Sequence, residues 1–387
     1  MAAGGSSRQA AGLFVASRGP LFAFMAMGVL WGSFAALVPD TKAMLGVDDA
    51  AWGLLLLCSA SGGIVAMLAA PRIGARLGGW GVPVATGCLA LAFALPGHMG
   101  AVWAFGLAMV FVGLGSGLLD VLMNARVSAI ESERGLHLMN LNHGFYSLAY
   151  AAGAGATGLA RSAGAGPAEV FTVAAALVGL MALATIEPGG RLGRLRPRAG
   201  DRAAALGLVP VLGGLVIFVA FLAENAAEVW SALHIERSLG GSPGQGSSGP
   251  ALLGLTMAAG RLAGQAVVQR LPEARLLTGG LLVAAAGAAL AALATVPLAA
   301  QAGFVVLGLG VSVVAPVAFA LVGRLATEET RARAIARASV LGYMGFFIGP
   351  PALGALADLF GLRASFLAIA ALLVVSLPLV APLLRRR

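Results

Sequence analysis

Residues 342–361 read GYMGFFIGPPALGALADLFG, and residues 146–165 read YSLAYAAGAGATGLARSAGA. Gly349 and Gly354 of the later stretch match Gly153 and Gly158 of the earlier one, at an offset of about 196 residues. Two shorter matches recur at nearly the same offset: Gly113-Leu114-Gly115 with Gly308-Leu309-Gly310, and Gly62 and Arg72 with Gly260 and Arg270. Because this offset is close to half of the 387 residues, the sequence predicts a duplicated bundle of helices.

The composition places this bundle in a lipid bilayer. Charged residues make up 11% of the chain and hydrophobic residues 59%, whereas an average soluble domain is about 25% charged. A helix that crosses an apolar layer about 30 Å thick needs about 20 apolar residues. On this basis we predict an all-α integral membrane protein with twelve transmembrane helices in two pseudo-symmetric six-helix bundles. The predicted spans are 20–38, 51–70, 82–97, 101–123, 138–160, 168–186, 207–235, 250–268, 276–297, 300–323, 336–357 and 362–383.

The basic residues predict the topology, because Lys and Arg near helix ends are retained in the cytoplasm. With the N-terminus inside, all but four of the 25 basic residues fall at the inner ends of helices; the four are Lys42, Arg161, Arg237 and Arg363. We therefore expect a multi-pass protein of the cell (inner or plasma) membrane with both termini cytoplasmic. The net charge of +9 then reflects topology, and no nucleic-acid partner is expected.

The same division predicts four segments. Residues 1–19 form a cytoplasmic tail without the apolar core and cleavage site of a signal peptide. Residues 20–186 form the first bundle, 187–206 an Arg-, Gly- and Pro-rich linker, and 207–387 the second bundle. Both cysteines, Cys58 and Cys88, lie inside predicted helices, so no structural disulfide and no metal site are expected. We expect no cofactor and a monomer.

Three carboxylates qualify as charges placed inside the membrane: Asp120, Glu224 and Glu228. Each costs about 2.5–3.5 kcal/mol to insert, so each needs a partner, water or a proton. Glu224 and Glu228 are four residues apart and therefore share one helix face. Two carboxylates so close cannot both ionise cheaply, so at least one is expected to hold a proton near neutral pH, as a proton-coupled carrier requires. Alternatively, the seventh helix begins late and leaves Glu228 and His234 among the external headgroups.

A second polar cluster is predicted where the fourth and fifth helices join. Asp120 and Asn124 lie one turn apart near the inner end of the fourth helix, and Asn142 and His143 open the fifth. The connecting loop is short, so these groups can meet. His143 is suited to relay protons, because imidazole ordinarily titrates near pH about 6.5. Alternatively, the cluster is a structural network that holds the loop.

Further candidates are solute contacts and moving parts. Aromatic rings and amides can stack on and hydrogen-bond a polar solute, although Trp and Tyr also anchor helices at membrane interfaces. Prolines remove backbone donors and interrupt helices, so they are expected to be kink or gating points or, alternatively, merely tolerated bends. Arg261, about 10 Å from a helix end, is expected either to pair with an acidic group of a neighbouring helix or to snorkel inward. The predicted solute contacts are Trp31, Asn124, Asn142, Tyr146, Asn225, Trp230 and Tyr343, and the predicted gating prolines are Pro316, Pro350 and Pro351.

Two six-helix lobes, a basic central loop and basic turns after the second and eighth helices resemble the major facilitator superfamily over essentially the whole chain. The hallmark turn of that family reads Gly-x-x-x-Asp-Arg-x-Gly-x-Arg-Arg. Arg72, Gly74 and Arg76 fit it, whereas Met67 and Pro71 replace its first Gly and its Asp. The resemblance implies gating at this turn and at its second copy, which comprises Gly260-Arg261, Gly264 and Arg270, with Gln265 where related sequences often place Asp.

Three stretches resemble the rhizopine-transport-like (MosC-like) branch, often grouped near sugar permeases: Asp120–Ala125, Asn142–Leu148 and Glu224–Ala232. The last departs at Val229, where an acidic residue is expected, and Glu228 stands one position earlier. The resemblance implies a secondary active transporter that moves a small polar organic solute by alternating access.

Within transport, proton-coupled symport of a sugar-like compound narrowly leads proton-coupled efflux of drugs or metabolites. An intramembrane enzyme is disfavoured by the duplication, by only four histidines, and by the lack of His-Glu-x-x-His and Gly-x-Ser-x-Gly motifs. A sensor that does not transport would need a soluble output domain, and the sequence shows none.

Overall fold

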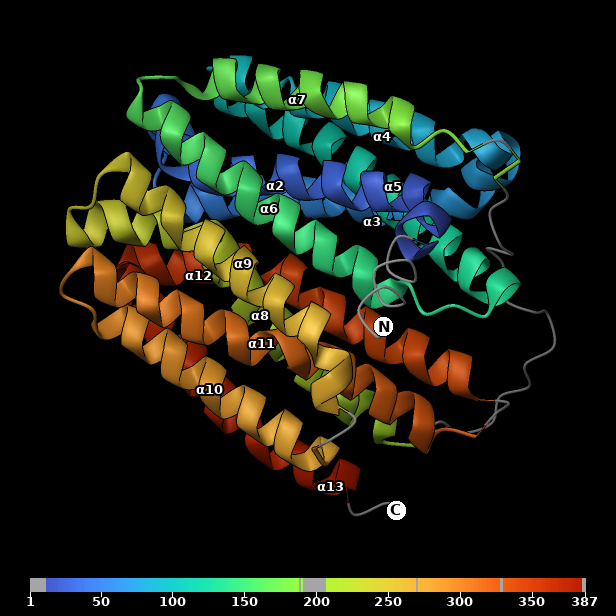
Figure 1. The fold of residues 1–387 in the computed structure, drawn as a ribbon. Helices are drawn as coiled ribbons and strands as arrows, with labels where there is room; N and C mark the ends of the chain where they lie inside the picture. The colour runs from blue at the N-terminus through green and yellow to red at the C-terminus, as the bar shows by residue number, and fades with distance from the viewer. Residues whose placement is uncertain (1–11, 188, 191–206, 269–270, 328–329, 385–387) are drawn as a thin grey trace, which may run out of the picture. The chain divides into compact units, whose positions relative to one another are not determined.

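The structure is a computed structural model that describes residues 12–187, 189–190, 207–268, 271–327 and 330–384. All secondary structure within these ranges is helical. The α-helices, drawn in Figure 1, are α2 (Arg18–Leu45), α3 (Asp49–Leu77), α4 (Gly81–Phe93), α5 (Val102–Arg134), α6 (Met139–Ser162), α7 (Pro167–Ala184), α8 (Val209–Leu233), α9 (Pro243–Val268), α10 (Glu273–Leu293), α11 (Pro297–Leu325), α12 (Arg331–Val375) and α13 (Val380–Leu384).

Each of the twelve predicted spans overlaps one of these helices, which confirms the all-α class. The last two spans both fall in α12, where Gly361 separates two helical stretches with a φ of 81°. Residues with a Cβ avoid this left-handed region, so a glycine suits the break. Eight helical stretches of the described chain are long and apolar enough to cross a membrane.

Several helices extend beyond their predicted spans. The fourth predicted span ends at 123, but α5 continues to Arg134; the eighth begins at 250, but α9 begins at Pro243. The prediction counted apolar residues, and a helix that has crossed the apolar layer can continue into the polar region beyond it. Pro316, Pro350 and Pro351 lie inside α11 and α12, which run through them. The helices are therefore not broken at these prolines, which fits the alternative of tolerated bends, because neighbouring helices can satisfy the backbone groups that a proline frees. The gating roles of the prolines stay predictions.

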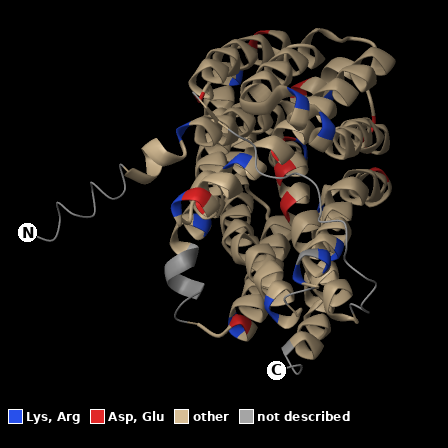
Figure 2. Ribbon diagram, turned by 90° about the vertical axis from the view of Figure 1, so that its right-hand side faces the viewer, with Lys and Arg blue, Asp and Glu red and all other residues tan. Residues whose placement is uncertain are grey.

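The helix surfaces are apolar outside as well as inside. Trp103 and Leu298 are 76% and 74% exposed, and Leu68, Leu159 and Leu359 are similarly open. Lys, Arg, Asp and Glu occupy only a few turns of otherwise uncharged ribbon in Figure 2. A soluble protein would bury such leucines, whereas lipid tails accept them.

The helices form two compact units. The first unit comprises Met1–Phe34, Cys58–Gly153 and Ala165–Pro197, and the second comprises Ala35–Leu57, Ala154–Gly164 and Arg198–Arg387. Thus α2, α3 and α6 each contribute one end to the first unit and the other end to the second. The predicted linker 187–206 and the beginning of the predicted tail 1–19 lie mostly outside the described residues, so these boundaries stay predictions.

The repeated glycines occupy matching places in the packing. A Cβ on Gly153 of α6 would lie 3.0 Å from the Cα of Val29 in α2. Its counterpart Gly349 of α12 faces α8, where a Cβ would lie 3.5 Å from Leu222 Cγ. The fifth and eleventh predicted helices therefore each pack on the first helix of their own half, α2 or α8, which supports the duplication.

Candidate functional site

The first polar cluster of the second unit lies in the middle of α8. Glu224 is about 22 Å along the helix from its start at Val209, and 7% of the residue is exposed. Arg261 of α9 donates from Nη2 to Glu224 Oε1 at 3.0 Å. Of the two alternatives for Arg261, the structure shows pairing with an acidic group of a neighbouring helix. The pairing is compatible with a membrane position, because each charge compensates the other.

Glu228 lies one turn further along α8 and is half-buried. Within the described part of the chain its carboxylate accepts no hydrogen bond and forms no ion pair. Two carboxylates thus lie near one guanidinium. The charges of the three groups sum to zero when one of the carboxylates holds a proton. Because α8 begins at Val209, the structure does not show a seventh helix that begins late. His234 is fully buried beside Phe366.

Three polar atoms of α8 are buried without a hydrogen-bond partner in the described ranges: Asn225 Oδ1, Trp230 Nε1 and Ser231 Oγ. Trp230 is 1% exposed, so its indole is enclosed by protein. Asn225 Oδ1 points towards α12, 3.6 Å from where a Cβ on Gly349 would lie. Buried polar groups are usually satisfied, so an acceptor of this kind is available to water or a solute.

An aromatic group adjoins these residues. The ring of Tyr343 in α12 lies 5.5 Å from that of Phe221 in α8, and Phe346 lies 4.9 Å from Phe221. Phe221 precedes Glu224 by three residues, so it lies on nearly the same helix face. Tyr343 is a predicted solute contact, whereas neither phenylalanine was predicted. The helical spacing of Phe221 from Glu224 was the signal that could have found it.

The second cluster lies in the first unit and joins α5 to α6. Asn124 donates to Asp120 Oδ1 at 3.1 Å and to the Asp120 carbonyl at 2.8 Å. His143 Nε2 lies 3.3 Å from Asn124 Oδ1. The structure therefore brings Asp120, Asn124 and His143 together across the short loop. No Lys or Arg of the described chain pairs with Asp120.

Other predicted residues of the first unit are engaged in packing. Asn142 is fully buried and bonds to Ser17 and to the Leu138 carbonyl, so the expectation that it joins the Asp120 cluster is wrong. The first turn of α6 points consecutive side chains about 100° apart, which separates Asn142 from His143. Trp31 donates to Ser116 Oγ at 3.2 Å, and Tyr146 is half-buried beside Tyr150.

The predicted gating turn closes α3. Arg72 and Arg76 are exposed, Gly74 is buried, and Pro71 is inside the helix. Neither arginine forms an ion pair with a described residue, which fits the missing acidic position. In the second copy, Arg270 lies outside the described residues. The gating roles of Arg72, Gly74, Arg76 and Arg261 stay predictions.

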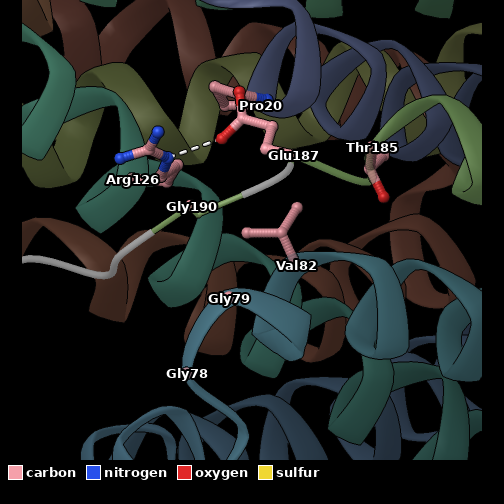
Figure 3. Close-up of a pocket in the computed structure, with 8 residues that line it drawn as sticks. All are labelled: Pro20, Gly78, Gly79, Val82, Arg126, Thr185, Glu187 and Gly190. Atoms are coloured by element: carbon pink, nitrogen blue, oxygen red, sulfur yellow. Dashed lines mark hydrogen bonds and ion pairs between the residues drawn. The ribbon is translucent and has the colours of Figure 1, made fainter.

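A shallow hollow in the first unit involves a different part of the chain (Figure 3). Arg126 Nε lies 2.6 Å from Glu187 Oε2, and the other carboxylate oxygen accepts from Gly19 N at 3.3 Å. These contacts tie α5 and the segment after α7 to the start of α2. None of the predicted solute contacts lines this hollow, whose walls are Pro20, Gly78, Gly79, Val82, Arg126, Thr185, Glu187 and Gly190.

Comparison with known proteins decides the family. An uncharacterised MFS-type transporter of Yersinia pestis is 32% identical over 360 residues, which cover 91% of each chain. The chain belongs to the major facilitator superfamily. The model of that family matches residues 213–387. Membrane protein MosC of Rhizobium meliloti is 28% identical over 363 residues, 92% of this chain and 86% of MosC, which confirms the resemblance seen in the sequence.

Solved structures show the same fold. The nucleoside transporter NupG aligns with a TM-score of 0.72 at 12% identity, over 96% of this chain and 99% of its own. A bacterial homologue of the human lysosomal transporter Spinster, in an inward-facing and occupied conformation, aligns with a TM-score of 0.69 at 17% identity, over 95% and 96%. This superfamily protein is a secondary transporter that works by alternating access in a membrane.

Proposed function

We propose that this transporter moves a small polar, sugar-like solute by symport with protons. The observation that carries the proposal is the arrangement of Glu224, Glu228 and Arg261, in which one buried and one half-buried carboxylate lie near one guanidinium. Without a bound proton, the two carboxylates and the guanidinium carry a net charge of minus one. Because a net charge is costly away from water, we expect one of the carboxylates to be protonated when the site is closed to water.

Glu224 is the residue that we assign to proton coupling. When its carboxylate is ionised, Arg261 holds it at 3.0 Å. When it accepts a proton, the attraction between Glu224 and the guanidinium of Arg261 weakens. A proton therefore changes which groups on α8 and α9 attract each other, and such a change can bias one conformation of a transporter over another.

The solute contacts that we propose in the second unit are Asn225, Trp230 and Tyr343. Asn225 offers a buried acceptor without a partner in the described chain, and Tyr343 belongs to an aromatic group with Phe221 and Phe346. Hydroxyl groups of a sugar-like solute can donate to the amide, while its apolar face can lie on the rings.

Two steps test the proposal. Purified protein is first screened by thermal shift against sugars, polyols, amino acids and drugs, since a ligand at about 100 times its Kd adds about 2.7 kcal/mol of stability. The stabilising solute is then offered to proteoliposomes under an imposed pH gradient. We expect uphill accumulation that stops when a protonophore collapses the gradient. Accumulation driven by a sodium gradient alone would overturn proton coupling, extrusion would favour efflux, and a chemically altered solute would indicate an enzyme.

The orientation is part of the same proposal. The distribution of basic residues favours cytoplasmic termini. A reporter fused after Arg387, and another inserted near Gly200, should both be cytoplasmic in intact cells. A signal from the outside for either would overturn the topology.

A further inference from the structure

The second unit contains two groups of aromatic rings that differ in burial. Phe304 and Phe366, whose rings lie 5.2 Å apart, are both buried and belong to the core. The other group, which we call the Phe221 ring group, comprises Phe221 of α8, Phe319 of α11, and Tyr343 and Phe346 of α12. Here Tyr343 is 45% exposed and the three phenylalanines are half-buried. The protein therefore leaves part of this second group of rings uncovered.

The rings of the group converge on Phe221 from two other helices. Their centroids lie 4.9 Å from that of Phe221 for Phe346, 5.5 Å for Tyr343 and 6.4 Å for Phe319. The ring planes are tilted against that of Phe221 by 37°, 44° and 52°, respectively. Because the rings are neither parallel nor perpendicular, the group offers ring faces and ring edges in several directions. Aromatic rings attract one another through just these face and edge contacts.

Close packing of α8 against α12 fixes the position of Phe221. A Cβ on Gly345 of α12 would lie 2.5 Å from the carbonyl oxygen of Phe218 in α8 and 3.3 Å from Phe221 Cβ. A Cβ on Gly342 would lie 3.6 Å from Phe221 Cε2. Glycines allow the two backbones to approach this closely. The rings are thus held by helices in close contact, and little further ordering is needed for them to bind a ligand.

The Phe221 ring group adjoins the polar residues of the proposed solute site. Phe221 precedes Glu224 by three residues and Asn225 by four, so the three side chains lie on one side of α8. Asn225 Oδ1 points towards Gly349, which follows Phe346 by three residues in α12. Charged side chains within a membrane protein face its interior or a water-filled space rather than lipid tails. The uncovered ring surface is therefore expected to be continuous with the solute site.

The chemistry of the rings indicates what they can bind. Apart from the Tyr343 hydroxyl, the four side chains have no atom that forms a conventional hydrogen bond. Hydroxyl groups pressed against them would lose their hydration without a replacement, which costs free energy. An aromatic group has no such loss, gains from leaving water, and adds face and edge contacts. One aromatic ring is enough for the apolar face of a sugar, whereas four suit an aromatic ligand.

We propose that the transported solute carries an aromatic substituent next to its hydroxyl-bearing part, and that the Phe221 ring group binds this substituent. The hydroxyls then donate to Asn225, as in the proposed function, on which this inference rests. Aryl glycosides are the simplest compounds of this class. The inference does not depend on the coupling ion.

Matched glycosides test this substrate class with the full-length protein. Methyl, cyclohexyl and phenyl β-glucosides, and the same three β-galactosides, are titrated into the purified protein in lipid nanodiscs by calorimetry. In at least one of the two series we expect the phenyl compound to bind about tenfold more tightly than the methyl compound. The cyclohexyl compound should bind about threefold more weakly than the phenyl compound, because its ring is apolar but has no π system.

Variants of the ring group test where the substituent binds. Phe346→Leu keeps an apolar side chain but removes the ring, so the preference for phenyl over methyl should fall from about tenfold to about twofold. The affinity for the methyl compound should stay within about twofold of the parent. Phe360→Leu is the matched control in the same helix, because Phe360 is 69% exposed, and it should keep the tenfold preference. If Phe346→Leu does not elute as one peak in size-exclusion chromatography, Phe319→Leu takes its place.

The outcomes separate this inference from the proposed function. Equal binding of methyl and phenyl compounds would overturn the inference and leave the sugar-like class standing. A phenyl preference that persists in Phe346→Leu, or in its replacement, would overturn it too, because the substituent would then bind elsewhere. Cyclohexyl compounds that bind as tightly as phenyl compounds would overturn the assignment to an aromatic substituent. If no member of either series binds, the inference and the sugar-like class fall together.

Discussion

The clusters around Glu224 and Asp120 differ in the chemical group that contacts the carboxylate. Glu224 in the second unit has a cation, Arg261, at 3.0 Å and a second carboxylate one turn away. In the first unit, Asp120 has the neutral amide of Asn124 at 3.1 Å and, through it, His143. An ion pair changes its attraction strongly when it gains a proton, whereas a bond to a neutral amide changes less. This difference favours the second unit for coupling.

Because the two halves are duplicated, Glu224 and Asp120 can each be compared with the residue at the matching position of the other half. At the offset of about 196 residues, Glu224 corresponds to Gly28 and Asp120 corresponds to Pro316. Gly28 packs against the backbone of α6 at Tyr150, so its place in the first half is structural. The two halves therefore share several packing glycines but not these two carboxylates. Packing tolerates repetition, while a transport site needs each group only once.

The largest expected effect separates the two carboxylates directly. Glu224→Gln should abolish gradient-driven accumulation but leave solute exchange at equal pH partly intact, because Gln resembles the protonated acid and cannot release a proton. Asp120→Asn should keep gradient-driven accumulation at a reduced rate. Both are measured in the same proteoliposomes with the solute found by thermal shift. Normal driven transport by Glu224→Gln would move the coupling role to Asp120.

The next effect concerns stability. Arg261→Gln leaves Glu224 buried without its cation and should lower the free energy of unfolding by about 3 to 5 kcal/mol. Adding Glu224→Gln should restore most of this loss. Arg324→Gln is the matched control, because Arg324 is 53% exposed, and it should change stability by less than about 1 kcal/mol. Unfolding of the purified proteins in detergent gives the values, and equal losses for Arg261→Gln and the control would mean that the buried pair is not special.

A smaller effect is expected at Glu228. Glu228→Gln removes the second carboxylate near Arg261 and leaves an amide that resembles its protonated form. The pH optimum of driven transport should therefore move by less than about one unit, with the maximal rate nearly unchanged. A full pH profile of both proteins measures this shift. Complete loss of transport would instead make Glu228 the proton carrier.

The smallest effect is expected in the cluster of Asp120, Asn124 and His143. His143→Phe keeps an aromatic ring next to Phe24, whose centroid lies 4.8 Å away, but removes the contact with Asn124. One such hydrogen bond contributes about 0.5–1.5 kcal/mol, and the melting temperature should fall accordingly. A loss as large as that of Arg261→Gln would contradict the view that His143 makes only a hydrogen bond to a neutral amide.

Local features of the chain predicted much of this architecture. In a bilayer every backbone group must be bonded within the protein, so an apolar stretch of sufficient length has to be helical. The helical repeat likewise placed Glu224 and Glu228 on one face and Asp120 beside Asn124 before any packing was known. The exact ends of α5 and α9, and the continuity of α11 and α12 through their prolines, depend on surroundings that hydropathy does not measure.

The sequence by itself determined that the chain is a duplicated helical membrane protein with buried carboxylates on two of its helices. Only the tertiary structure decided which partners those carboxylates have. Arg261 pairs with Glu224, and Asn142 forms a hydrogen bond with Ser17. Asp40, Glu236 and Ser247 all accept hydrogen bonds from Arg161. Periodicity follows from the geometry of one helix, whereas these pairings depend on how each helix is rotated against its neighbours, and that rotation is set by packing along the whole length of both.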